Sequence, residues 1–304
     1  MEIKVLQQEY EYSSTLFGCI GYERRSIHLL QTMASSGFGK KIFFDYKAEG
    51  VLSYDQNLSE SADTIDFIHH DFDKCVARLL HEVEMDPYRS IAVDITSMDR
   101  RKLARLIVAL FKHSSIIESI SLFYCPATFR PPSTGFDVVT AFGPVLPHFM
   151  GNSVFLRENL SLIAGAGYEF GRIIGAIDSL EPKRVSCFMP IGTDDRYRPA
   201  VMRANLDFSF LEGNDALIQY DLSDTAALYY NLRRIVEEEN TRSNVMILPL
   251  GPKIFAAISM VIGMILHPNI MIWRHSTVDP ARPNSVTDAE AAGEVIQFSF
   301  AFQA

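Results

Sequence analysis

The chain has 304 residues, of which 48% are hydrophobic and 21% charged, a composition typical of a globular protein that is long enough for two ordinary domains. Its 37 acidic residues outnumber its 28 basic ones, and the net charge of −9 argues against direct binding of duplex DNA, which needs a stripe of Lys and Arg.

The sequence also argues against export and membrane insertion. The first residues are too polar for a signal peptide, and the most apolar stretch, 254–265, is too short to span a bilayer and predicts a buried helix. The four cysteines form no C-x-x-C pair, so we expect buried, reduced thiols in a cytoplasmic protein that uses no metal and no cofactor. These cysteines are Cys19, Cys75, Cys125 and Cys187.

Apolar runs alternate with amphipathic runs along the first half of the chain. In chain order the pattern predicts a strand at 15–20, a helix over 25–34, strands at 41–45 and 64–68, a helix over 72–83, a strand at 90–95, a helix over 100–112 and a strand at 117–124. Strands that alternate with helices in this way are typical of a parallel, doubly wound sheet covered on both faces.

The second half repeats this order. The pattern predicts a strand at 161–165, a helix ending near 180, strands at 183–189 and 216–220, a helix over 225–239, a strand at 245–248, a helix over 253–266 and a strand at 270–273. Three pairs of short segments match at a slowly growing offset: 21–23 with 167–169, Asp71 with Asp221, and 94–102 with 248–253. We therefore expect an α/β protein of two tandem Rossmann-like units with mostly parallel, doubly wound sheets, spanning 1–150 and 151–304 and divided within 126–152.

In open parallel sheets, ligands bind beyond the carboxyl ends of the strands, where the strand order reverses. The first loop in such a position contains glycines, which let backbone N–H groups approach a phosphate, and two arginines that could add charge-assisted contacts. The alternative is a tight turn in which Ser26 caps the following helix. The candidate ligand-binding residues of this loop are Gly21, Tyr22, Glu23, Arg24 and Arg25, with Gly167, Tyr168 and Glu169 as their counterparts in the second half.

The second loop, 94–102, combines carboxylates, hydroxyls and cations between a strand and a helix. Thr96, Ser97 and Arg101 are candidates for binding a phosphate or a ribose, as are Gly251 and Lys253 in the matching loop of the second half. The alternative is that Ser97 or Asp99 only caps the helix and that the cations are solvated.

The third loop, 190–198, follows a strand of the second half. Thr193 and Asp194, together with Asp221, are candidates for binding ribose hydroxyls, as acidic residues often do at this position, and the alternative is a solvated loop. His69 and His70 form a metal-like pair, but neighbours on a strand point to opposite faces, so we do not expect them to share an ion.

The Gly-Tyr-Glu turn and the later segment 94–102 together resemble the CRISPR-associated Rossmann fold (CARF) family. In that family the later strand ends in an Asp-x-Thr-Gly-Gly-Thr-Lys segment that contacts a cyclic oligoadenylate. Asp94 and Thr96 match its start, whereas Ser97 and Met98 replace its two glycines and Lys102 comes later than the family's lysine. The resemblance covers both halves and implies two units that face each other and share a ligand.

The leading functional hypothesis is a nucleotide-sensing protein that binds a nucleotide or another anionic small ligand. The resemblance implies a cyclic oligonucleotide second messenger of antiviral defence, with the signal passed on through dimerisation or a protein partner. The first alternative is a nucleotide-processing enzyme, a phosphodiesterase of the ring-nuclease type or an N-glycosidase, with Asp94, Asp99, Arg100 and Lys102 as candidate catalytic residues. The second is a structural subunit of a defence complex.

Overall fold

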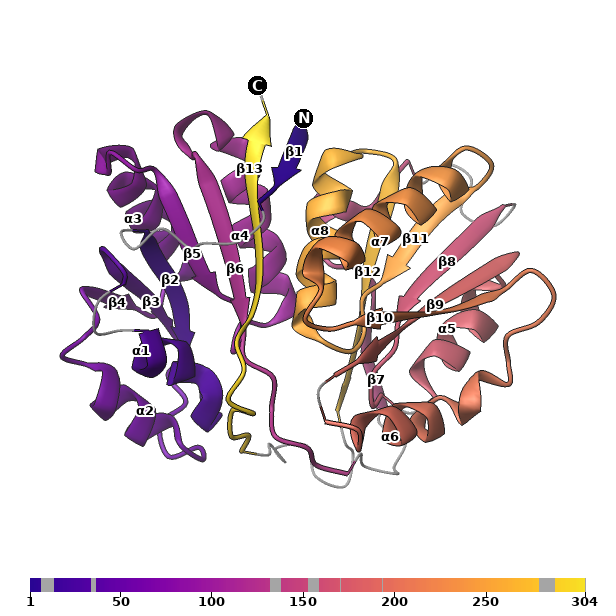
Figure 1. Ribbon diagram of the computed structural model, residues 1–304, viewed down its shortest axis with the longest axis horizontal. Coiled ribbons are helices and arrows are strands. Elements are labelled where there is room, and N and C mark those ends of the chain that lie inside the picture. The colour runs from indigo at the N-terminus through magenta and orange to yellow at the C-terminus, as the bar shows by residue number, and fades with distance from the viewer. Residues whose placement is uncertain are drawn as a thin grey trace. The chain divides into compact units, whose positions relative to one another are not determined.

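The computed structural model describes residues 1–6, 14–33, 37–131, 138–152, 159–169, 171–192, 194–278 and 288–303. The chain divides into two compact units. The first unit comprises residues 1–128 and 286–304, and the second comprises 129–285 (Figure 1). Each is an α/β unit with one mostly parallel sheet, so the predicted fold class is confirmed.

The first unit contains a sheet of seven strands in the order β1-β13-β6-β5-β2-β3-β4. The strands are β1 (Glu2–Val5), β2 (Thr15–Ile20), β3 (Lys41–Asp45), β4 (Phe67–His69), β5 (Ser90–Asp94), β6 (Ser119–Tyr124) and β13 (Ile296–Gln303). The helices are η1 (Arg24–Ile27), α1 (His28–Met33), α2 (Tyr54–Ser61), α3 (Phe72–Met85), α4 (Arg100–Lys112) and the short η2 (Ser114–Ile116). Strands β2 to β6 are parallel, and β13 is antiparallel to both β6 and β1.

The second unit contains a sheet of six strands in the order β10-β9-β8-β11-β12-β7. The strands are β7 (Val138–Pro144), β8 (Leu160–Gly165), β9 (Arg184–Ile191), β10 (Ala216–Asp221), β11 (Asn244–Leu248) and β12 (Ile270–Val278). The helices are α5 (Arg172–Leu180), α6 (Tyr197–Ala204), α7 (Thr225–Asn240), α8 (Lys253–Ile265) and the short η3 (Pro147–Phe149) and η5 (Leu206–Phe208). Strands β8 to β12 are parallel, and β7 is antiparallel to β12.

The two sheets have the same winding. The order β4-β3-β2-β5-β6 corresponds strand by strand to β10-β9-β8-β11-β12, and in both the chain starts in the middle, moves to one side, and then crosses to the other. The strand order therefore reverses between β2 and β5 in the first unit and between β8 and β11 in the second. This is the place where doubly wound sheets bind their ligands.

The two units exchange their antiparallel edge strands. After β6 the chain leaves the first sheet and forms β7 at the edge of the second, and after β12 it returns and forms β13 against β6. The division into 1–150 and 151–304 therefore differs from the structure, because β7 belongs to the second sheet and β13 to the first. Periodicity identifies a strand but not its partner, which lies far away in the sequence.

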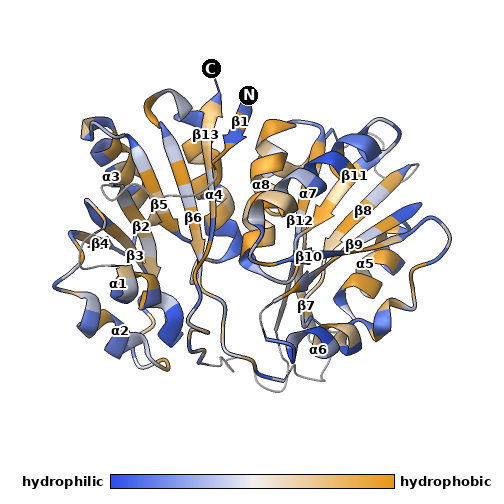
Figure 2. Ribbon diagram, in the orientation of Figure 1, coloured by the Kyte–Doolittle hydropathy of each residue, from blue (hydrophilic) through white to orange (hydrophobic). Residues whose placement is uncertain are grey.

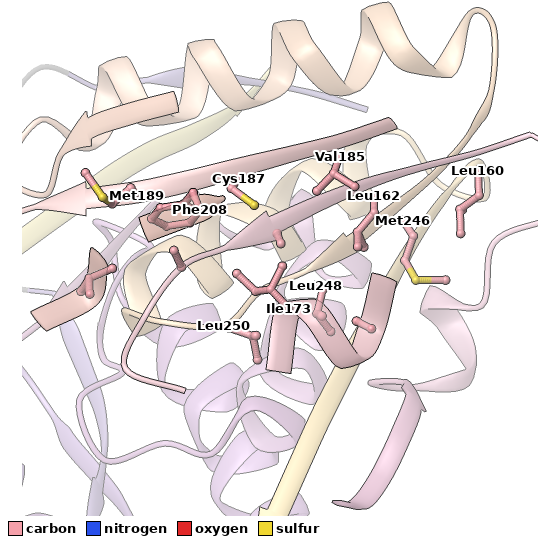
Figure 3. Close-up of a cluster of buried hydrophobic side chains, with 14 of the residues drawn as sticks. Leu160, Leu162, Ile173, Val185, Cys187, Met189, Phe208, Met246, Leu248 and Leu250 are labelled. Atoms are coloured by element: carbon pink, nitrogen blue, oxygen red, sulfur yellow. The ribbon is translucent and has the colours of Figure 1, made fainter. Parts of the chain in front are cut away.

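Strand burial follows from the position of each strand in its sheet. Every residue of β2 and of β8 is buried, as expected for central strands covered on both faces. Successive residues of β2 point to opposite faces of the first sheet. Leu16 belongs to a core cluster with residues of α1 and α2, whereas Phe17 contacts Phe72 of α3, with ring centroids 5.8 Å apart. The corresponding cluster under α5 and α6 of the second unit is shown in Figure 3.

The apolar segment 254–265 is the buried helix α8, as predicted, and it is among the hydrophobic (orange) helices in Figure 2. Among the described residues, no helix is long and apolar enough to cross a membrane. All four cysteines are free and buried, and burial raises the pKa of the Cys75, Cys125 and Cys187 thiols to about 12. They therefore stay protonated at neutral pH, as expected for inert core thiols.

Helix α2 was not predicted, since 54–61 resembles a polar loop. Its buried face is itself largely polar, and it consists of Tyr54, Asn57 and Ser61. An amphipathic pattern cannot identify a helix that buries hydrogen-bonding groups in place of apolar ones.

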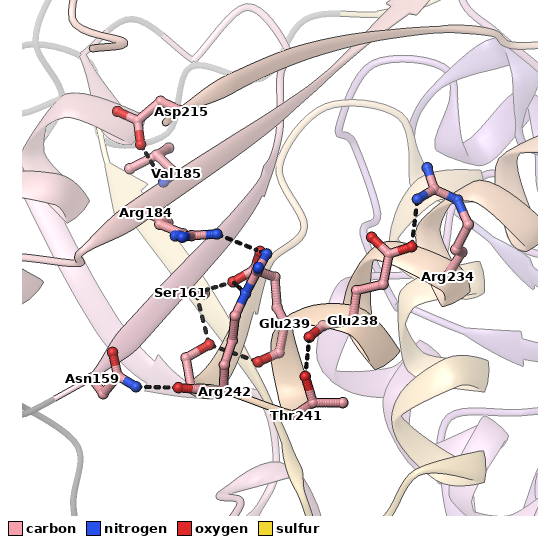
Figure 4. Close-up of polar contacts among 11 residues, drawn as sticks. Asn159, Ser161, Arg184, Val185, Asp215, Arg234, Glu238, Glu239, Thr241 and Arg242 are labelled. Atoms are coloured by element: carbon pink, nitrogen blue, oxygen red, sulfur yellow. Dashed lines mark hydrogen bonds and ion pairs between the residues drawn. The ribbon is translucent and has the colours of Figure 1, made fainter. Parts of the chain in front are cut away.

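Glu239, at the end of α7, ties this helix to the beginnings of β8 and β9 (Figure 4). Its carboxylate accepts a hydrogen bond from Ser161 Oγ at 2.6 Å, and it forms ion pairs with Arg242 and, at 3.5 Å, with Arg184. Burial alone would raise the pKa of this carboxyl, but the hydrogen bonds from Arg242 and Ser161 outweigh it and hold the pKa below its ordinary value of 4.5. The charged form therefore stabilises the second unit at neutral pH, and this stabilisation is lost as the pH falls through the lowered pKa.

We predict that Glu239→Gln lowers the free energy of unfolding by about 1–3 kcal/mol at pH 7, because the amide leaves Arg242 and Ser161 with a poorer partner. The difference from the unchanged protein should shrink as the pH falls from 4.5 through the lowered pKa of Glu239, where the folded carboxylate becomes protonated. Urea unfolding at several pH values measures both effects. Glu238→Gln is the matched control, since the exposed ion pair of Glu238 with Arg234 contributes little. Equal losses of unfolding free energy in Glu239→Gln and Glu238→Gln would contradict the stabilising role assigned to the Glu239 carboxylate.

The exchanged strand β13 provides a second prediction. Phe300 is 2% exposed, and its residue is paired with Ile120 of β6. Phe300→Ala should cost about 3–5 kcal/mol and should increase hydrogen exchange at the β6 amides, because the substitution opens a cavity under the strand that pairs with them. Exchange at β11, in the other sheet, is the internal control. Unchanged protection of β6 would mean that β13 contributes little to the first unit.

Candidate functional site

At both reversal points, two loops approach each other at glycine residues. A Cβ on Gly21 would lie 3.0 Å from Ser97 Cβ, so the turn after β2 touches the loop after β5. In the second unit the approach is closer, since a Cβ on Gly167 would lie 2.5 Å from Gly251 Cα. Gly251 itself has φ +68°, in the left-handed region that favours glycine. These glycines let the two loops pack against each other.

A buried asparagine fixes each Gly-Tyr-Glu turn. Asn57 Nδ2 of α2 donates to Gly21 O at 3.0 Å and to Glu23 O at 2.9 Å. Asn205, directly after α6, donates from Nδ2 to Gly167 O at 3.0 Å. Both asparagines are almost fully buried. Sequence reasoning missed this pair, although extending the repeat from Gly21 and Gly167 would have aligned the two residues.

Both arginines of the first turn are held by residues of their own unit. Arg24 donates to Asn57 Oδ1 at 3.0 Å and forms an ion pair with Glu60 at 2.5 Å. Arg25 forms an ion pair with Glu23 at 2.9 Å and donates to Cys125 O at 3.0 Å. Their guanidinium groups therefore stabilise the turn through contacts with the rest of the first unit.

In the loop after β5, the helix-cap interpretation of Asp99 is confirmed. Its carboxylate accepts from the backbone N–H groups of Arg101 and Lys102, and Lys102 Nζ lies 2.7 Å from the second oxygen. Burial would raise the pKa of Asp99, but the hydrogen bonds from Lys102 outweigh it and lower the pKa. Tyr46 adds a hydroxyl donor at 3.1 Å and a ring 4.6 Å from Lys102 Nζ.

The other polar residues of this loop lie deeper. Asp94 and Thr96 are buried, with Asp94 Oδ1 accepting from Thr96 N–H and Thr96 Oγ1 accepting from Cys125 N–H. Ser97 Oγ is buried and makes no hydrogen bond with any residue that the structure describes. Arg100 begins α4, and Arg101 is exposed on the same helix.

The Gly-Tyr-Glu turn of the second unit lies among aromatic rings. Tyr168 stacks on Tyr197 at the start of α6, with centroids 5.5 Å apart and the planes 9° from parallel. Phe129 meets Tyr197 edge-on at 5.2 Å, and the Arg196 guanidinium lies 4.9 Å above the Phe129 ring. An ion pair holds Arg196 against Asp194. Thr193, the neighbouring candidate, lies outside the described residues.

On the β12 side of the same edge, polar and charged groups gather. Glu169 Oε1 accepts from Gly251 N–H at 3.2 Å. His275 lies within electrostatic range of Glu169 and of Arg172, the first residue of α5. Burial, followed by the charge of Arg172, lowers the pKa of His275, so its ring is neutral at pH 7. Phe142 contacts both His275 and Trp273, so these two side chains share one face of β12.

Three buried polar atoms along this edge make no hydrogen bond within the part of the chain that the structure describes: Tyr168 Oη, Trp273 Nε1 and His275 Nδ1. Buried polar groups almost always have partners, so such atoms call for a ligand or a solvent molecule. Of these three residues, only Tyr168 is among the candidates predicted from the sequence.

The remaining candidates have structural contacts. Asp221 accepts from the N–H and hydroxyl of Ser223 at 2.8 and 2.7 Å, which shapes the turn before α7. Lys253 begins α8 directly after the Gly251 loop.

The expectation that His69 and His70 point apart is wrong, because their rings stack with centroids 4.5 Å apart. His70 lies beyond the end of β4, where the alternation of a strand no longer applies. No group of three or more His, Cys, Asp or Glu residues suited to a metal ion occurs in the described ranges.

A separate pocket of about 700 Å³ lies in the first unit, next to the beginnings of β2 and β3 and the end of α3. Its lining contains four carboxylates, Asp63, Asp66, Glu82 and Asp86, against Lys40 and Lys41. This balance does not favour an anionic ligand, and the pocket lies at the opposite ends of the strands from the loops described above.

No family model and no curated protein sequence matches the chain. Among solved structures, it is similar to UDP-GlcNAc 2-epimerase from Neisseria meningitidis bound to UDP-GlcNAc, with 11% identity, a TM-score of 0.23, and coverage of 78% of this chain and 76% of that one. A second structure, of UDP-N-acetylglucosamine 2-epimerase, gives 12% identity, a TM-score of 0.23, and coverage of 80% and 74%. Similarity at this level carries no information about a ligand.

The asparagine anchors give a paired prediction. Asn57→Ala should lower the free energy of unfolding by about 1–3 kcal/mol for each buried carbonyl left without a donor, and Asn205→Ala should do the same for the second unit. Hydrogen exchange should increase at the turn of the altered unit alone. Suppose that either substitution lowers the free energy of unfolding no more than replacing an exposed asparagine with alanine does. The buried asparagine then contributes little to the stability of its unit.

Proposed function

We propose that the chain is a nucleotide-sensing protein whose ligand site lies at the carboxyl edge of the second sheet, around the Gly-Tyr-Glu turn at Gly167. The observation that carries the proposal is the set of buried polar atoms of Tyr168, Trp273 and His275 that lack a described protein partner. Tyr168 lies on the turn after β8, at the reversal of strand order where doubly wound sheets bind nucleotides. Trp273 and His275 lie on β12, which pairs with β11 beside this reversal.

The aromatic part of this edge suits a nucleobase. Tyr168, Tyr197 and Phe129 present ring faces and edges next to one another, and Arg196 adds a planar cation. Stacking on aromatic side chains and arginine is how proteins commonly bind bases that are not paired. Asp194, held by Arg196, provides a carboxylate near the rings for ribose hydroxyls.

The polar part suits a phosphate. Helix α5 begins at Arg172, and its N-cap position, Gly171, provides no side-chain cap. Its first N–H groups and its dipole therefore favour an anion there, and Arg172 brings a positive charge to the same place. A neutral His275 can donate or accept one hydrogen bond at Nδ1, which is the atom without a described partner.

The resemblance of the Gly-Tyr-Glu turn and of segment 94–102 to the CARF family supports a cyclic oligonucleotide as the ligand, with a role in antiviral defence exercised through dimerisation or a partner. The side-chain contacts of Asp99 and Lys102 favour binding over catalysis in the first unit, because both groups already hold the start of α4.

Trp273 allows a direct test, because it is the single tryptophan of the chain and lies in the proposed site. Titration with linear nucleotides and cyclic oligoadenylates should change the intrinsic fluorescence for the compounds that bind, and calorimetry should give the same affinity. If no member of the panel binds in either assay, the proposal fails.

Substitutions locate the ligand within the site. Arg172→Ala should weaken binding roughly 10- to 100-fold through loss of a charge-assisted phosphate contact, and Tyr168→Ala should weaken it through loss of base stacking. Arg234→Ala, which removes an exposed arginine on α7, is the matched control for charge. Equal weakening by Arg172→Ala and Arg234→Ala would show that only net charge matters.

A further inference from the structure

The chain takes an unfavourable backbone conformation directly after α6. Leu206, Asp207 and Phe208 follow one another with φ angles of +50°, +51° and +56°. In this left-handed region the Cβ of an L-residue lies too close to the following carbonyl oxygen, at a cost of roughly 5- to 30-fold per residue in the equilibrium constant. Every other non-glycine residue of positive φ in the described ranges stands alone in the sequence. The turn 206–208 is therefore a concentrated site of backbone strain.

This strained turn is held by the residues at its two ends. Phe208 is 5% exposed and belongs to the core cluster under α5 and α6 (Figure 3). Asn205, just before the turn, is buried and donates from Nδ2 to Gly167 O at 3.0 Å and to Val201 O at 2.9 Å. Leu206, between these two anchors, is 48% exposed. Strain persists where surrounding contacts fix it, and here one of those contacts is with the Gly-Tyr-Glu turn of the second unit.

The segment that leads into the strained turn has a small buried surface. Asp194 and Arg196 form an ion pair within the segment, and Tyr197 N–H donates to Asp194 O at 3.1 Å. The buried face of α6 consists of Ala200, Val201 and Ala204. Such small side chains remove little apolar area from water. This face, the ring of Tyr197 and the side chain of Asn205 are contacts that must be broken for segment 194–205 to move.

The start of α6 covers the Gly-Tyr-Glu turn. The ring of Tyr197 is stacked on that of Tyr168, with centroids 5.5 Å apart and planes 9° from parallel. A base that inserts between two parallel rings needs them about 7 Å apart, which is twice the contact distance between carbon atoms. The two rings must therefore separate before a base can lie between them, and Tyr197 moves with the helix that it begins.

We propose that segment 194–205 is a lid over the site in the second unit and that the strained turn 206–208 is its hinge. In the closed state Tyr197 lies on Tyr168 and the hinge is left-handed. Opening separates the two rings, breaks the hydrogen bond from Asn205 and lets the hinge relax, so the strain lowers the free energy that opening requires. The inference rests on the proposed function for what the lid admits, whereas the hinge can be tested without a ligand.

Hydrogen exchange of the ligand-free protein tests the hinge. Glycine adopts positive φ without a Cβ clash, so Leu206→Gly should favour the closed state and slow exchange of the α6 amides. We expect a slowing of roughly fivefold or more relative to Leu206→Ala, which removes the same exposed side chain but keeps the strained Cβ. Ser209→Gly is a second control, because Ser209 has φ −65° and glycine relieves no strain there. Exchange should not slow in this variant.

The position of the affected amides distinguishes a lid from general stabilisation. In the unchanged protein the α6 amides should exchange faster than those of β8, the buried central strand of the same sheet, because a lid opens while the sheet stays folded. Equal exchange rates in α6 and β8 would overturn the inference. Equal exchange of α6 in Leu206→Gly and Leu206→Ala would overturn it as well.

A linear nucleotide or cyclic oligoadenylate that binds provides a second readout. Its association rate, followed through Trp273 fluorescence, should be roughly fivefold or more lower in Leu206→Gly than in Leu206→Ala, since fewer molecules have an open lid. If such a compound binds and both variants take it up equally fast, the lid is contradicted while the proposed function stands. If none of these compounds binds, the proposed function fails, and the exchange rates still decide whether 206–208 is a hinge.

Discussion

The structure depends on the close approach of two backbone loops at each reversal of strand order. In the second unit, Gly167 and Gly251 come so near that a Cβ on Gly167 would meet the Gly251 backbone at 2.5 Å. Glycine at these positions lets the first turn lie directly against the loop of the fourth parallel strand. Asn205 then fixes the turn to the end of α6. The side chains of the turn, at the carboxyl edge of the second sheet, are therefore carried by a backbone that is held in place.

The two units use this common frame differently. In the first, Arg24 and Arg25 are engaged in ion pairs with their own unit, and Asp288 and Ala289 accept the N–H groups of the turn. In the second, aromatic rings surround the turn, and buried polar atoms of Tyr168, Trp273 and His275 lack described partners. The turn of the first unit is thus covered by a carboxylate of the chain itself, whereas the corresponding turn of the second unit lies among aromatic rings and buried polar atoms.

Much of the fold could be predicted from the sequence, because parallel strands and their crossover helices leave a strong local pattern, as at 90–94 and 100–112. The exchange of β7 and β13 could not, since the pairing of an edge strand depends on contacts far away in the sequence. The same limit applies to the site. The loops were identified, but the partners of Arg24, among them Asp288, lie far away in the sequence. His275 becomes notable only next to Arg172 and Glu169.

A crystal structure of the protein with a nucleotide that it binds tests the account most directly. The account predicts electron density for a base against Tyr168 and Tyr197 and for a phosphate near Arg172, with Trp273 donating a hydrogen bond to the ligand or His275 donating or accepting one. Density for the nucleotide at the first unit alone, with no density at this edge of the second sheet, would contradict the assignment of recognition to the second unit.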